Sequence, residues 1–124
     1  MVFILRPLLL IMLLAQDISN NKRVLCIYTI SADNPAYVEQ LRLLAADGPG
    51  LKERDIVIEK FIFNGQTVAG FRKRLVKGDF AIILTGKDGG EKYRSSKVLT
   101  LQKLYAIVDG MPMRREEMRR KKDE

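Results

Sequence analysis

Three short apolar segments constrain the fold of this chain more than any other feature of its sequence. Residues 24–30 and 80–85 are apolar on both alternating sets of positions, which is typical of strands covered on both faces. Residues 55–63 are rich in β-branched and aromatic side chains and predict a further strand. Because segments with helical spacing lie between them, we expect an α/β domain built around a central sheet.

Three helices are predicted, each with its own end signals. The first begins at the cap residue Asn34, which precedes a proline, and ends at residues 47–50. The second covers the apolar positions between residues 68 and 75. The third is capped by Thr100 and stopped at residues 110–112, where Gly and Pro occur.

The order of these elements leaves few arrangements open. Residues 86–90 read Gly-Lys-Asp-Gly-Gly and predict a tight turn, so the charged segment 91–95 should pair back as an edge strand. The helix between the first two strands makes them parallel, with a right-handed crossover. We therefore predict the order β-α-β-α-β-β-α, a sheet in the order 2-1-3-4 and helices on both faces. That arrangement is a thioredoxin-like three-layer α/β/α sandwich.

The predicted domain covers residues 20–112, and a charged tail follows it at residues 113–124. In the tail, Glu116 with Arg120, and the pair one residue later, have the order that favours a helix. We expect the tail to extend as a solvated helix.

The first 15 residues have the order of a secretory signal peptide. Arg6 precedes an apolar run at residues 8–14, and Ala15 suits a cleavage site. The run is too short to span a membrane, which takes about 20 apolar residues. The alternative is a buried strand or helix of the domain. We expect a signal peptide at residues 1–15, and hence a secreted or periplasmic protein without a transmembrane segment.

Composition excludes many enzyme classes. The chain has 124 residues with no His and one Cys. These counts exclude catalytic Ser-His-Asp or Cys-His groups, His-bound zinc or haem, an intrachain disulfide and a Cys-rich metal site. We expect no cofactor and no metal.

Three segments together resemble a known family. They are residues 31–37 (Ser-Ala-Asp-Asn-Pro-Ala-Tyr), the turn at 86–90, and residues 109–118, which contain Met-Pro-Met-Arg-Arg-Glu-Glu-Met. The chain resembles the P-DUDES family over about residues 20–118. This domain of unknown function occurs in small secreted bacterial proteins and in vertebrate matrix proteins of the sushi-repeat and coiled-coil-containing kind. The resemblance implies a thioredoxin- or peroxiredoxin-like fold and no established activity.

Cys26 is the obvious candidate for redox chemistry. In a thioredoxin-like domain the redox thiol belongs in the loop after the first strand, but residues 31–34 contain no sulfur. Cys26 lies inside the apolar strand, where a Cys usually behaves as a small buried hydrophobe. The loop itself, with Ser31 and Asn34, is a candidate binding site, because such loops bind ligands in this kind of sheet.

An excess of basic residues gives the chain a formal charge of +7. One interpretation is solvated faces that aid solubility. The other is a site for an anionic partner, such as an acidic protein or polysaccharide, whereas no recognition motif for nucleic acid is present. The candidate binding residues are Arg72, Lys73, Arg74 and Lys77 on the second helix, Lys92 and Arg94 on one face of the edge strand, and Arg114 and Arg115 in the tail.

The sequence therefore favours a secreted, non-catalytic interaction or binding module over an enzyme. One alternative is a peroxiredoxin-like oxidoreductase that uses Cys26. The other is a polyanion-binding protein.

Overall fold

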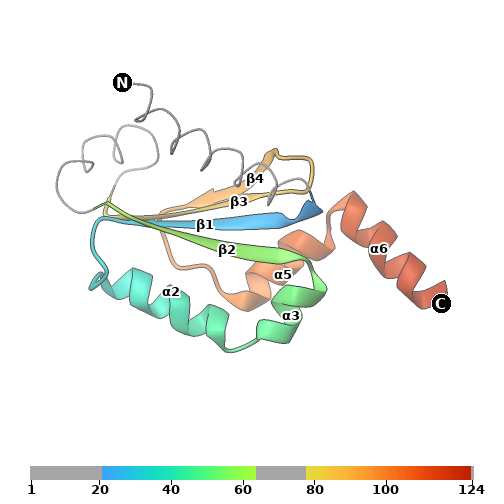
Figure 1. Ribbon diagram of the computed structural model, residues 1–124, viewed down its shortest axis with the longest axis horizontal. Helices are drawn as coiled ribbons and strands as arrows, with labels where there is room; N and C mark the ends of the chain where they lie inside the picture. The colour runs from blue at the N-terminus through green and yellow to red at the C-terminus, as the bar shows by residue number, and fades with distance from the viewer. Residues whose placement is uncertain (1–20, 64–77, 124) are drawn as a thin grey trace, which may run out of the picture.

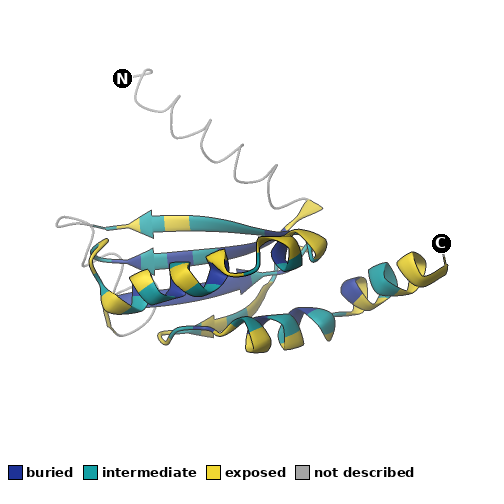
Figure 2. Cartoon of the chain, turned by 90° about the horizontal axis from the view of Figure 1, so that it is seen from below, coloured by how far each residue is buried: buried dark blue, intermediate teal, exposed yellow. Residues whose placement is uncertain are grey.

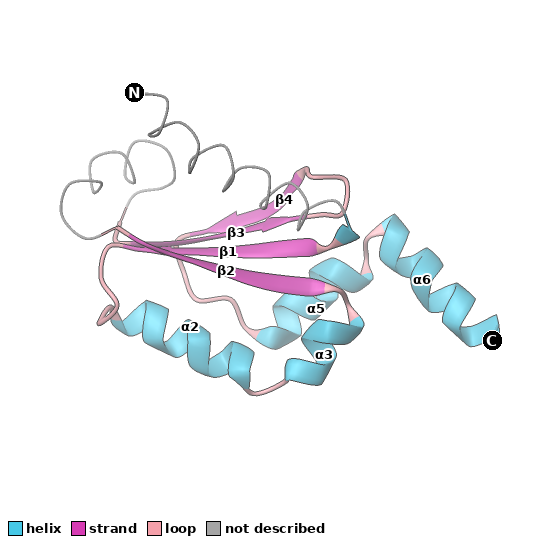
Figure 3. Ribbon diagram, in the orientation of Figure 1, coloured by secondary structure: helices cyan, strands magenta, loops and turns pink. Residues whose placement is uncertain are grey.

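The computed structural model describes residues 21–63 and 78–123 (Figures 1 and 3). The described strands form one mixed sheet in the order β2-β1-β3-β4, which confirms the α/β class and the predicted strand order. The elements are β1 (Arg23–Thr29), α2 (Pro35–Ala45), α3 (Gly48–Glu53), β2 (Ile56–Ile62), β3 (Phe80–Thr85), β4 (Glu91–Ser95), α5 (Leu101–Asp109) and α6 (Pro112–Asp123).

The strand register fixes which residues share an edge of the sheet. β1 and β2 are parallel, with Arg23 beside Ile56, and α2 and α3 form the crossover between them. β3 is antiparallel to β1, with Val24 beside Thr85, and β4 is antiparallel to β3. The start of β1, the start of β2 and the β3–β4 hairpin therefore meet at one edge, and the loop after β1 lies at the other.

The described helices α2, α3 and α5 cover one face of the sheet (Figures 1 and 2). The hydrophobic core lies between them and alternate residues of the central strands. Its fully buried members include Leu25, Ile27, Ile82, Leu84, Leu104 and Val108.

Two predicted features lie outside the described residues. One is the helix over residues 68–75, on which the second helical layer of the sandwich depends, together with its basic residues Arg72, Lys73, Arg74 and Lys77. The other is the signal peptide at residues 1–15.

The predicted start of α2 is confirmed. The Asn34 side chain accepts a hydrogen bond from the Ala36 amide at 2.9 Å, and Pro35 occupies the first helical turn. Further along α2, the buried side chain of Gln40 donates to the carbonyl of Leu99 at 2.9 Å and accepts from its amide at 2.7 Å. Gln40 thereby connects α2 to the segment that leads into α5.

Helix α3 was not predicted from the sequence. Residues 47–50 end α2, but they also begin a helix, because the Asp47 carboxylate accepts from the Gly50 amide at 3.0 Å. Tyr105 of α5 donates its hydroxyl to Asp47 Oδ2 at 2.8 Å. Residues 47–50 therefore both end α2 and begin α3. The Asp47 carboxylate serves as the N-cap of α3.

The charged tail forms the predicted helix, α6, but this helix is not wholly solvated. Its first turns pack against the domain, and Arg114 is only 5% exposed. Glu116 lies 3.7 Å from Arg120 as expected, whereas Lys121 contacts Glu53 of α3 at 3.1 Å. Contacts between charged side chains from distant segments therefore join residues 112–117 to the domain.

Gln40→Ala should lower the free energy of unfolding by about 2–4 kcal/mol, because it leaves the buried amide and carbonyl of Leu99 without partners. Urea denaturation of the purified protein measures this change. Arg42→Ala on the exposed side of α2 is the control and should change stability by less than about 0.5 kcal/mol. Equal stability of the two variants would contradict the assigned role of Gln40.

Candidate functional site

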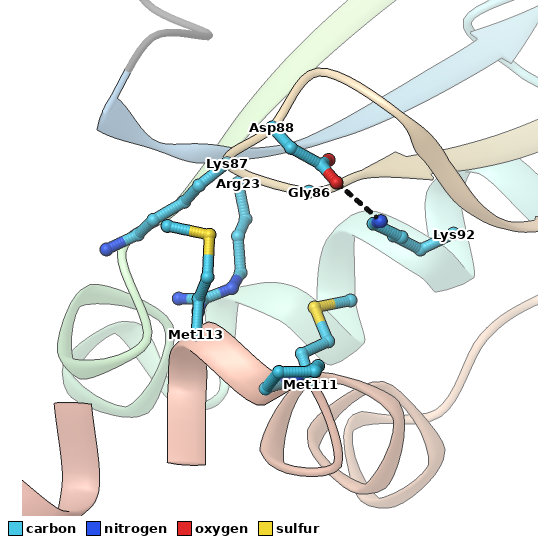
Figure 4. Close-up of a pocket in the computed structure, with 8 residues that line it drawn as sticks. Arg23, Gly86, Lys87, Asp88, Lys92, Met111 and Met113 are labelled. Atoms are coloured by element: carbon cyan, nitrogen blue, oxygen red, sulfur yellow. Dashed lines mark hydrogen bonds and ion pairs between the residues drawn. The ribbon is translucent and has the colours of Figure 1, made fainter. Parts of the chain in front are cut away.

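Two of the three segments that carried the family resemblance meet at one edge of the sheet. The β3–β4 turn, residues 86–90, faces the α5–α6 junction at residues 111–113, and Arg23 at the start of β1 lies between them (Figure 4). The loop at residues 31–34 lies at the opposite edge of the sheet. The candidate site is thus at the amino ends of β1 and β2, whereas the loop at residues 31–34, one of the candidate binding sites named from the sequence, follows the carboxyl end of β1.

Arg23 is the central side chain of this edge and is only 1% exposed. Its Nη1 donates to the carbonyl of Arg54 at 2.6 Å and to Glu117 Oε1 at 3.3 Å, and its Nη2 donates to Glu117 Oε2 at 3.1 Å. Its Nε is buried and has no hydrogen-bond partner among the described residues. An unsatisfied buried N–H of a cation is costly, and an acceptor oxygen from a bound ligand would remove that cost.

Ion pairs link Arg23 to three segments that are far apart in the sequence. Lys87 Nζ of the hairpin lies 2.9 Å from Glu117 Oε2 of α6 and 2.8 Å from Asp55 Oδ2, just before β2. Lys22 Nζ lies 3.2 Å from the other oxygen of Asp55. Asp55 also has φ of +53°, a left-handed backbone conformation that is uncommon outside glycine and that Asp adopts more readily than most residues. We call Lys22, Arg23, Asp55, Lys87 and Glu117 the edge network.

The edge network sets the protonation of its carboxylates. Burial alone would raise the pKa of Glu117, but the hydrogen bonds from Arg23 and Lys87 outweigh it, so the pKa is lowered. The same balance, with Lys87 and Lys22 as donors, lowers the pKa of Asp55. Burial would lower the pKa of Lys87, but its two carboxylate partners raise it. All of these groups are therefore charged at neutral pH.

A second group of charges holds the α5–α6 junction in place. Asp109, the last residue of α5, accepts from Arg54 Nε at 3.0 Å and from Arg114 Nε at 3.1 Å. The Arg54 guanidinium also lies over the ring of Tyr105, 3.8 Å from its centroid. These contacts position residues 111–113 opposite the hairpin.

A pocket of about 290 Å³ lies between the hairpin and the junction. Met111, Pro112 and Met113 form its apolar wall, Arg23 lines it beside them, and residues 86–88 close the hairpin side. In the hairpin, Gly89 has φ of +81°, a conformation that favours glycine and that suits the tight turn predicted at residues 86–90. The pocket has a mainly apolar wall with one buried cation, a combination that is typical of small-ligand sites.

The two predicted residues of β4 lie in different surroundings. Lys92 lines the pocket and donates to Asp88 Oδ2 at 2.9 Å (Figure 4). Arg94 pairs with Glu91 at 2.6 Å and lies near Tyr28. The register of β3 with β4 shifts between Leu84 and Thr85, so Lys92 is an extra, unpaired residue of β4. At such a bulge, successive side chains no longer alternate between the two faces of the sheet. Lys92 and Arg94 therefore do not share a surface, in contrast to the prediction.

The remaining predicted residues lie away from the pocket. Ser31 and Asn34 use their side chains locally, because Ser31 accepts from the Asp33 amide at 3.2 Å and Asn34 caps α2. Arg115 is exposed on α6. Arg114 is buried, and its guanidinium pairs with carboxylates of the domain, which removes it from any external surface.

Cys26 is half-buried and lies on the face of the sheet turned away from α2 and α5. Burial raises the pKa of its thiol, the hydrogen bond with Tyr28 lowers it, and Glu59 on the neighbouring strand raises it again, for a net increase. The thiol is therefore predominantly protonated at neutral pH. Burial, followed by the proximity of Cys26, raises the pKa of Tyr28 to about 12.

Sequence reasoning missed Arg23 and Lys87 as site residues. Arg23 has a recognisable signal, because it shares strand alternation with Leu25 and Ile27 and must therefore point toward the core. Lys87 lies in a turn motif that predicts a hairpin and nothing about its partners. In the described part of the chain, no cluster of potential metal ligands occurs, and no helix is long and apolar enough to cross a membrane.

Acid should destabilise the protein as the carboxylates whose pKa values are lowered by the fold become protonated. Asp55, Asp109 and Glu117 have folded pKa values below the ordinary 3.8 for Asp and 4.5 for Glu, so their stabilising effect is complete above these values. It is lost as the pH falls through the lower folded values. Circular dichroism melts should show a constant melting temperature from about pH 5.5 to 8 and a steep decline below about pH 4.5.

Glu117→Gln should lower the free energy of unfolding at pH 7 by about 1–3 kcal/mol, because Arg23 and Lys87 lose a shared carboxylate. It should also reduce the loss of stability in acid. Glu116→Gln, one residue earlier and on the exposed side of α6, is the matched control and should have little effect. A Glu117→Gln variant with wild-type stability at every pH would contradict the importance of the edge network.

Comparison with known proteins identifies a family for this chain. A search of curated proteins finds no significant match to the chain. The family model described as Domain of unknown function (DUF4174) matches residues 14–117, which include every described strand and the first half of α6. The chain therefore belongs to the DUF4174 family.

Proposed function

We propose that this chain is a non-catalytic binding module that recognises a carboxylate through the Arg23 pocket. The observation that supports this most is the Arg23 Nε–H, which is buried beside the pocket without a hydrogen-bond partner among the described residues. A carboxylate oxygen that reached it would form a charge-assisted hydrogen bond and remove the cost of the unsatisfied group. Lys92 at the rim would attract the same charge.

The surroundings of Cys26 argue against the oxidoreductase alternative. A reactive thiol needs a lowered pKa and access to solvent. The pKa of Cys26 is raised instead, mainly by burial, and Glu59 disfavours the thiolate further. Residues 31–34, where a thioredoxin-like domain would carry its thiol, contain no Cys, and their side chains form a turn and a helix cap.

The proposal also includes the fold family and the cellular location of this module. The strand order 2-1-3-4 is compatible with a thioredoxin-like domain of the P-DUDES kind, which would lack the redox Cys pair. The apolar run at residues 8–14 supports secretion or a periplasmic location. An acidic protein or a uronic-acid polysaccharide outside the cytoplasm would carry suitable carboxylates.

Binding can be tested with tetraglutamate as a carboxylate probe. The side-chain Nε–H resonance of Arg23, assigned with the help of Arg23→Lys, should shift on titration, and added salt should weaken the effect. Shifts confined to residues 68–77 would favour polyanion binding through the second helix and overturn the assignment to the Arg23 pocket. The absence of any shift with carboxylate probes would overturn the proposed function.

The redox alternative is tested by peroxide turnover with wild type and Cys26→Ser. We expect no turnover in either, and slow thiol labelling of the native protein that becomes fast on unfolding, because burial protects Cys26. Turnover by wild type that is lost in Cys26→Ser would show that the protein is an oxidoreductase.

A further inference from the structure

The hydrogen-bond donors of the pocket limit what can bind there. Both terminal nitrogens of Arg23 already donate, to Glu117 and to the carbonyl of Arg54. These contacts use three of the five guanidinium N–H groups. The Nε–H and one Nη2–H remain on the same side of the guanidinium, and this pair of donors matches the two oxygens of a carboxylate. The pocket therefore suits a ligand that places the planar oxygen pair of a carboxylate against this side of Arg23.

The charges around the pocket limit the charge of that ligand. Hydrogen-bonded ion pairs join Lys22, Arg23 and Lys87 to Asp55 and Glu117, and Lys92 to Asp88. Four cations against three carboxylates leave one uncompensated positive charge. A single negative charge is balanced by this arrangement, so a monocarboxylate should bind more tightly than a dianion or polyanion, whose further charges would face Asp88 and Glu117.

The apolar wall of the pocket determines which group the ligand should carry besides its carboxylate. Met111, Pro112 and Met113 line the pocket with two thioethers and a ring, and Met113 is 52% exposed although it is a large apolar side chain. Thioether sulfur makes favourable contacts with aromatic rings, and flexible methionines adapt to a flat ligand. A volume of about 290 Å³ is at the lower limit of small-molecule sites, so the ligand should be small.

We infer that the pocket binds a small aromatic monocarboxylate, with its carboxylate on Arg23 Nε and near Lys92, and its ring between Met111 and Met113. This inference rests on the proposed function, because it specifies the ligand of the same site. The carboxylate would complete the hydrogen bonding of Arg23, and the ring would cover apolar surface that is now exposed to solvent.

The test uses the full-length protein and four probes: phenylacetate, acetate, 2-phenylethanol and tetraglutamate. Titrations monitor the Arg23 Nε–H and the methyl resonances of Met111 and Met113. Phenylacetate should shift all three signals and bind about tenfold more tightly than acetate, because only phenylacetate has a ring for the apolar wall. 2-Phenylethanol should bind more weakly than phenylacetate, because it lacks the charge.

The outcomes separate this inference from the proposed function. If tetraglutamate or acetate shifts Arg23 as strongly as phenylacetate does, the aromatic monocarboxylate is wrong and the carboxylate-binding module stands. If no probe shifts Arg23, both proposals are wrong.

Variants that leave the buried network intact supply the second measurement. Met113→Ala should weaken phenylacetate binding about fivefold without changing the affinity for acetate, because it removes only ring contacts. Lys92→Ala should weaken both carboxylates, and Lys97→Ala, an exposed lysine outside the pocket, is the matched control. Unchanged phenylacetate affinity in both Met113→Ala and Lys92→Ala would overturn the inference.

Discussion

The buried contact between Arg23 and Glu117 connects the first strand to the last helix, and the rest of the candidate site depends on it. The two residues are 94 positions apart in the sequence. Burying a guanidinium costs several kcal/mol unless its hydrogen bonds and charge are satisfied, and Glu117 and the Arg54 carbonyl supply these partners. Lys87 binds the same Glu117 carboxylate from the hairpin. This convergence holds α6 beside the hairpin and thereby forms the pocket.

The same contact leaves Arg23 incompletely satisfied, and this gives the site its specificity. Structural ion pairs normally use every available donor, whereas the Nε–H of Arg23 has no partner among the described residues. The domain keeps a fixed donor in a buried setting, where a hydrogen bond to an incoming oxygen is stronger than in water. Binding energy at such a site comes from preorganisation, because the guanidinium is already held in place when the ligand arrives.

Local sequence patterns predicted the fold well and the candidate site poorly. Asn34 and Thr100 are helix caps as predicted, and the turn around Gly89 adopts the expected positive φ. Caps and turns depend on neighbouring residues, so the local sequence contains the necessary information. Arg114 and Lys92 were both named as basic residues of a binding surface; Lys92 lines the pocket, whereas Arg114 is buried. Their surroundings depend on the docking of α6, which composition and spacing do not encode.

The sequence by itself determined the α/β class, the strand order and the exclusion of histidine- and disulfide-based chemistry. The spacing of apolar residues distinguishes strands from helices, and the handedness of crossover connections limits the topology. A residue type that is absent from the sequence cannot take part in catalysis or cross-linking. Only the tertiary structure decided that the pocket lies at the amino ends of β1 and β2 and that Arg23 is its central donor. The physical reason is that residues far apart in the sequence form ion pairs only where the packing of the fold brings them together. The partners of Arg23 were therefore set by how β1, the hairpin and α6 pack together, and not by any motif in which Arg23 lies.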